Sequence, residues 1–180
     1  MAYQALTKIQ VATAAEVCAH YDLENEARTL LRNNKKANPL DFVESLMARQ
    51  QYLSGIEFIA HALPAREAIW WGCLCLQHAY GDRLAGASRT ACQAAVRWVI
   101  KPNEENRAAA DGPAEMAGLG STAGNLALAV KQSGQAATAA KSVVRAIKLA
   151  ALRCGPAAMI GTQKAFLDLG LKVAAGEFIG

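Results

Sequence analysis

Cys73, Cys75 and His78 are the residues of this sequence whose types and spacing come closest to a metal site. They lie in a stretch rich in aliphatic residues that we expect to be helical. On a helix, residues two apart point ~200° away from each other, so the two thiols cannot share one ion. Cys75 and His78 can share one, but a structural zinc ion takes four ligands. We therefore predict buried thiols, no metal site and no cofactor.

A nucleophilic enzyme is the second chemical alternative, because five cysteines accompany three histidines in the chain. A Cys–His pair needs its two side chains within hydrogen-bond reach, which spacing along the chain does not establish. A Glu–Arg site formed by Glu67 and Arg66 beside Trp70 and Trp71 is another form of this alternative. Motifs for a nucleophile elbow, a phosphate loop or dinucleotide binding are missing. We therefore favour a non-catalytic protein and keep a small enzyme as the alternative.

The helix that we predict over about residues 64–80 has one apolar face and one mixed face when its residues are placed about 100° apart. The apolar face must be core. The mixed face combines large aromatic and hydrogen-bonding groups, a composition typical of protein interfaces. We predict that it is a protein-binding patch made of Arg66, Glu67, Trp70, Trp71, Gln77 and His78.

Three other interpretations of this mixed face stay open. The tryptophans can pack in the core, as large aromatic side chains commonly do. Arg66 or Glu67 can form a structural ion pair that orients the helix. A second copy of the chain can cover the whole face, which would make the protein a structural homo-oligomer.

A smaller group of charged residues recurs at helical spacing further along the chain: Lys141, Arg145 and Lys148. Its plain interpretation is a solvated helix face. Leu149 and Leu152 project near it, so a secondary basic patch for an acidic partner is the alternative. The net charge of +4 is spread along the chain, without the dense basic footprint of nucleic-acid-binding proteins. We therefore predict no nucleic-acid partner.

Local capping and stop signals predict where the helices begin and end. Helices begin after capping side chains and at proline, and they end at glycine or before proline. We also expect Asp111-Gly112-Pro113 to interrupt one helix. The predicted starts are Thr13, Asn38-Pro39, Pro64, Ser88 or Thr90, Asn103, and Ser121 or Thr122, and the predicted stops are Gln50-Gln51, Gly81, Lys101-Pro102, Gly155-Pro156 and Gly176.

The whole pattern predicts an all-α fold. Good helix formers dominate, and alternating runs of β-branched residues are missing. A length of 180 residues suits one domain. We predict a single domain over residues 1–180, a compact bundle of about eight helices around a central buried helix, with residues 1–12 as a flexible arm.

Cysteine usage and hydropathy bear on the compartment. The five cysteines are scattered and odd in number, and the chain opens without a secretion signal. No apolar stretch approaches the ~20 residues that a membrane span needs. We therefore expect a cytoplasmic protein with free thiols and no membrane span.

Residues 62–73, ALPAREAIWWGC, resemble the signature L-P-x-R-E-A-V-W-W-A-C of an uncharacterised bacterial family, a domain of unknown function. The segment from Arg97 to Ala109 resembles that family's W-V-x-x-P-x-E-x-N-R-x-A-A. Residues 121–127, 132–134 and 166–170 resemble further motifs, so the resemblance covers about residues 38–176. It implies an association with type VI secretion gene neighbourhoods, near spike and effector genes, and it implies no catalytic residues.

The chain departs from that family pattern at three places. Asp111-Gly112-Pro113 interrupts an otherwise unbroken helix, the loop after Gly134 is shorter, and Asn125 and Lys131 stand where aromatic residues are usual. The association implied by the resemblance suggests an adaptor or chaperone for a secretion spike or effector, a role that fits a helical domain with an aromatic patch. We expect a non-catalytic protein-interaction module of that kind.

Overall fold

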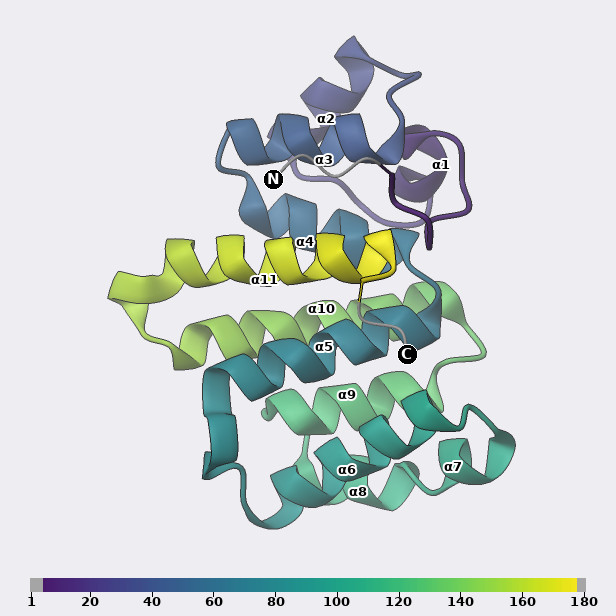
Figure 1. Ribbon diagram of the computed structural model, residues 1–180, viewed down its shortest axis with the longest axis vertical. Coiled ribbons are helices and arrows are strands. Elements are labelled where there is room, and N and C mark those ends of the chain that lie inside the picture. Colours follow the sequence, from purple (N-terminus) through teal and green to yellow (C-terminus); the bar gives the residue numbers. More distant parts are fainter. Residues whose placement is uncertain (1–4, 178–180) are drawn as a thin grey trace.

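The computed structural model describes residues 5–177 and confirms the all-α class, because every regular element in that range is a helix (Figure 1). The α-helices are α1 (Ala14–Cys18), α2 (Asn25–Asn33), α3 (Pro39–Ala48), α4 (Tyr52–Ala62), α5 (Ala65–Tyr80), α6 (Gly86–Ile100), α7 (Glu104–Ala108), α8 (Asp111–Ala117), α9 (Thr122–Lys131), α10 (Ala136–Arg153) and α11 (Met159–Ala175). Two 3₁₀ turns, η1 (Gly81–Arg83) and η2 (Pro156–Ala158), complete the order. None of the described helices is both long and apolar enough to cross a membrane.

Capping side chains begin four helices where the sequence predicts them. Thr13 and Glu16 form a complete capping box at the start of α1. The side chains of Asn38, Asn103 and Ser121 accept backbone N–H groups in the first turns of α3, α7 and α9. Each cap satisfies a donor that the first helical turn leaves without an intrahelical partner.

Positive backbone φ angles mark several of the chain reversals. Gln50 has a φ of 58° and separates α3 from α4, and Gly81 has a φ of 55° and ends α5. The prediction for the start of α6 is wrong, because this helix begins at Gly86 rather than at Ser88 or Thr90. Its N-cap, Ala85, makes no side-chain hydrogen bond, so the local sequence carries no capping signal there.

The helices are arranged in layers around α5 and α10 (Figure 1). Helices α4 and α11 lie on one side of this pair, α9, α6 and α8 lie on the other, and α3 packs on α4 at the outer edge. Helix α5 contacts α6, α9, α10 and α11 and buries its predicted inner face, including Ile69, Cys75 and Leu76. The prediction of a compact bundle around a central helix is therefore confirmed.

The N-terminal segment from residue 5 onward packs against the end of α11. The backbone N–H of Lys8 donates to the Ala174 carbonyl at 2.9 Å, and the Thr7 hydroxyl donates to the Ala175 carbonyl at 2.9 Å. Leu6 is buried. These bonds use carbonyls that the last turn of a helix leaves free. Of the flexible arm expected over residues 1–12, the part from residue 5 is thus held on the bundle, and residues 1–4 lie outside the described residues.

The departures from the family pattern are accommodated by contacts near α8 and α9. Asp111, at the start of α8, forms an ion pair with Lys131, at the end of α9. Asn125 is fully buried, and its side-chain amide donates to the Leu119 and Ser121 carbonyls, each at 2.8 Å. These polar residues therefore bind the α8–α9 connection to α9.

Candidate functional site

Trp71, one of the predicted binding residues, lies in the core. Its side chain is fully buried, and its Nε1–H donates to the Phe166 carbonyl of α11 at 2.8 Å. The indole ring lies against Gly170, where an added Cβ would come within 2.7 Å of two ring carbons. A buried indole N–H needs a partner of this kind. Core packing, one of the interpretations left open by the sequence, therefore describes Trp71, which no partner can reach on the folded chain.

Arg66 joins the start of α5 to the end of α6. Its Nε donates to the Val99 carbonyl at 2.7 Å in a partly buried contact. That carbonyl is among the last four of α6, which lack intrahelical donors, and a cation there also complements the helix dipole. Arg66 thus orients α5 through a backbone carbonyl, where the sequence left a carboxylate partner as the alternative.

Four side chains of α5 face outward between α6 and α11. Arg66 marks the border with α6, and His78 marks the border with α11, because its ring packs edge-on against Phe166 with centroids 5.5 Å apart. At about 100° per residue, the α5 positions between these borders turn away from both neighbours. We call them the α5 stripe: Glu67, Trp70, Leu74 and Gln77, of which Gln77 is exposed and the others are partly exposed.

Trp70 is the large aromatic residue of the α5 stripe. It keeps part of its surface exposed, yet its Nε1 is buried and has no hydrogen-bond partner among the described residues. Ile100, which follows the Val99 carbonyl bound by Arg66, is 73% exposed at the end of α6. A buried indole N–H without an acceptor costs free energy. The two tryptophans of the sequence motif thus have different environments.

The cysteines of α5 are buried. A hydrogen bond with Cys92 of α6, together with burial, raises the pKa of Cys73 well above its ordinary value, and burial raises the pKa of Cys75. The thiolate is the nucleophilic form of cysteine. These two thiols therefore do not support the Cys–His enzyme alternative. Within residues 5–177, no three His, Cys, Asp or Glu side chains are grouped so that they could hold a metal ion.

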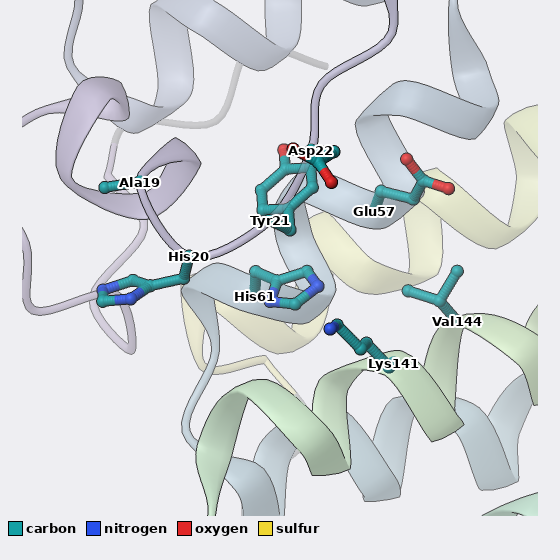
Figure 2. Close-up of a pocket in the computed structure, with 8 residues that line it drawn as sticks. All are labelled: Ala19, His20, Tyr21, Asp22, Glu57, His61, Lys141 and Val144. Atoms are coloured by element: carbon teal, nitrogen blue, oxygen red, sulfur yellow. The ribbon is translucent and has the colours of Figure 1, made fainter.

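A polar pocket that we did not predict from the sequence lies between α4, α10 and the turn that follows α1 (Figure 2). Its volume is about 490 Å³. The segments that form it are far apart in the sequence. The lining residues are Ala19, His20, Tyr21 and Asp22 from the turn, Glu57 and His61 from α4, and Lys141 and Val144 from α10.

Tyr21 and His61 form the wall of this pocket. Their rings are stacked, with centroids 4.4 Å apart and planes 9° from parallel. Burial, together with the smaller effects of the positive charges of Lys141 and His20, lowers the pKa of His61 from its ordinary 6.5 to about 4. Burial also raises the pKa of Tyr21. His61 is therefore neutral at neutral pH, and its Nδ1 is buried with no hydrogen-bond partner in the described chain.

The predicted basic patch is divided by the structure. Lys148 forms an ion pair with Glu57 across the α4–α10 contact, with Nζ and Oε1 2.5 Å apart. Arg145 is exposed. Lys141 is exposed, lines the pocket and has no ion pair among the described residues. One basic side chain of the three is thus structural, and another faces the pocket.

The sequence carried a weak signal for this pocket. Glu57 and His61 are four residues apart on one helix, and Lys141 and Lys148 are seven apart on another, so each pair shares a helix face. The sequence does not reveal that these two faces meet, because that depends on how α4 and α10 pack. Nor does it place Tyr21 against His61.

Comparison with known proteins agrees with the expectation of an uncharacterised domain family. A family of unknown function (DUF6931) matches residues 42–174. No curated protein and no solved structure matches the chain. The matched range includes α5 and the α4 and α10 sides of the pocket, whereas residues 19–22 precede it. This chain belongs to the family of unknown function DUF6931.

Proposed function

We propose that this chain is a non-catalytic protein-interaction module, which acts in the cytoplasm as an adaptor or chaperone for a type VI secretion spike or effector. The observation that carries the binding part is the partial exposure of Trp70, a large aromatic side chain on the outward-facing α5 stripe. The class of partner rests on the resemblance of residues 62–73 to a family found near type VI secretion genes.

The α5 stripe has the composition of a small recognition surface. Trp70 and Leu74 offer apolar area, and Glu67 and Gln77 add polar groups beside it. Tryptophan is among the residues that contribute most to protein interfaces, especially where polar neighbours form a rim. Ile100 is a further exposed apolar side chain, at the end of α6 to which Arg66 is bonded.

The helix that carries the stripe is fixed before any partner binds. Trp71 holds it to α11, and Arg66 holds it to α6. Binding to a preorganised surface loses little conformational entropy, which favours affinity. The contact of Trp71 with α11 gives this buried residue of the motif a structural role.

Binding measurements with a Trp70→Ala variant test this proposal. The purified chain is titrated by calorimetry with purified spike and effector proteins from the same gene neighbourhood. We expect saturable binding to one of them, and Trp70→Ala to weaken it about 30-fold, which corresponds to ~2 kcal/mol for an anchor tryptophan. Met116→Ala is the matched control, because Met116 is 66% exposed in α8, outside the stripe.

The variants are first compared by circular dichroism, so that loss of folding is not mistaken for loss of binding. Equal affinity of Trp70→Ala and wild type would remove the stripe from the proposal. Failure to bind any spike or effector would refute the proposed class of partner. A wild-type dimer in sedimentation velocity that Trp70→Ala converts to a monomer would favour the homo-oligomer alternative.

A further inference from the structure

We propose that the pocket between α4, α10 and residues 19–22 binds a small oxyanion, a phosphate or carboxylate group, held by Lys141 and His61. Its lining shares no residue with the α5 stripe. The proposal therefore does not depend on the function proposed above.

Two pairs of side chains face each other across the contact between α4 and α10. Glu57 and Lys148 form a complete ion pair at 2.5 Å. The second pair is His61, one turn after Glu57 on α4, and Lys141, about two turns before Lys148 on α10. These two side chains interact electrostatically. The first pair sets an acid against a base, whereas the second sets an imidazole against a cation. The second pair thus lacks the negative charge that the first pair contains.

The charge of Lys141 is available to a ligand. Its side chain is exposed and makes neither an ion pair nor a hydrogen bond to another described side chain. Figure 2 shows its ammonium group pointing toward the ring of His61. The lining contains two carboxylates. Glu57 forms an ion pair with Lys148. Asp22 lies beside Tyr21, and in Figure 2 the His61 ring lies between Asp22 and Lys141.

His61 supplies the second contact. Its Nδ1 is buried without a partner in the described chain, and the ring is fixed by the stack with Tyr21. The charged and titratable groups that line the pocket with it are His20, Tyr21 and Asp22 from the turn, Glu57 on its own helix and Lys141 from α10. An oxyanion beside Lys141 would offset the positive charge that disfavours imidazolium. Binding would then raise the pKa of His61, and an N–H of its ring would donate to the anion.

The pocket suits this ligand class better than a metal ion or an apolar molecule. A volume of about 490 Å³ accommodates a small ligand. Most lining side chains can ionise or hydrogen-bond, and Ala19 and Val144 are the aliphatic ones. No metal-binding group of three or more side chains occurs within residues 5–177. An ammonium group and an imidazole N–H can both donate hydrogen bonds to phosphate or carboxylate oxygens.

The test follows the histidine side chains by ¹H–¹³C NMR while inorganic phosphate or acetate is added at constant ionic strength and pH 6. We expect a saturable shift of the His61 signals with at least one anion, and a higher pKa of His61 in its presence. Lys141→Gln should weaken that binding about tenfold or more, because it removes a charge-assisted hydrogen bond. Arg145→Gln, exposed one turn away on the same helix, should leave it unchanged.

Each outcome of this experiment decides a point. Saturation with phosphate alone assigns a phosphate-group ligand, and saturation with acetate alone assigns a carboxylate. The proposal is overturned if neither anion shifts His61 saturably, or if Arg145→Gln weakens binding as much as Lys141→Gln. Lys141→Arg keeps the cation and should restore most of the affinity. Trp70→Ala should titrate like wild type, which separates this result from the test of the α5 stripe.

Discussion

The contact between Trp71 and Gly170 provides the sharpest test of the architecture. In a Gly170→Ala variant, the new methyl group would lie 2.7 Å from the Cε2 and Cζ2 atoms of Trp71 and 3.1 Å from Nε1. The indole cannot easily retreat, because it is fully buried and its N–H is bonded to the Phe166 carbonyl at 2.8 Å. Either the ring or α11 must therefore shift by several tenths of an ångström.

The expected loss of stability follows from two opposing terms. Alanine in place of a mid-helix glycine stabilises a helix by up to about 1 kcal/mol. Overpacking a tight core costs about 1–3 kcal/mol, and contact with a rigid ring favours the upper half of that range. We expect Gly170→Ala to lower the free energy of unfolding by about 1–2 kcal/mol. Gly161→Ala is the matched control, because nothing lies within 4 Å of a Cβ added there, and it should be neutral or stabilising.

A double-mutant cycle identifies the cause. Trp71→Phe removes the ring atoms that the new methyl group would meet, so Gly170→Ala should cost less in that background. The expected coupling is about 1–2 kcal/mol. Urea denaturation followed by far-UV circular dichroism measures all four variants. Two results would refute the close approach of α5 and α11. One is that the stability losses of the two single variants add up to that of the double variant within about 0.5 kcal/mol. The other is that Gly170→Ala is as stable as Gly161→Ala.

Three further predictions concern the pocket and the loops. Because the folded state holds the pKa of His61 near 4, its unfolded form takes up a proton first as the pH falls. The free energy of unfolding should thus drop between about pH 6.5 and 4, by ~1–2 kcal/mol after allowance for solvent screening. Urea denaturation midpoints measure this drop across the pH range, and they should drop less in the His61→Gln variant. Asn125→Ala should cost about 2 kcal/mol in urea unfolding, because two carbonyls lose the buried amide that donates to them; a cost near zero would contradict this. Thr13→Ala should remove the capping bond to Glu16 and cost about 1 kcal/mol, seen as faster amide exchange in α1, whereas unchanged exchange there would count against the cap.

Helix positions were largely predictable because their signals are local. The side chains of Thr13, Asn38 and Asn103 each accept a hydrogen bond from the backbone N–H three residues later, so a short segment of sequence is enough to predict the start of the helix. The start of α6 at Gly86 was not predictable in this way, since no capping side chain marks it. The apolar face of α5 was also predictable, because a side chain's direction on a helix follows from its number alone.

The environments within the candidate sites were decided by the tertiary structure. The sequence placed Trp70 and Trp71 together on one mixed face of a helix, but it could not say which of them α11 would cover. About a hundred residues further along the chain, the Phe166 carbonyl accepts the hydrogen bond of the Trp71 indole, and Gly170 lies against its ring. Trp70 stays partly exposed. The pocket depends even more on the tertiary structure, because Tyr21, His61 and Lys141 come from three distant segments. Local chemistry thus determined the helices and their inner faces. Burial, ion pairing and the shifted pKa of His61 depend on which faces meet, and only the packing of the helices decided that.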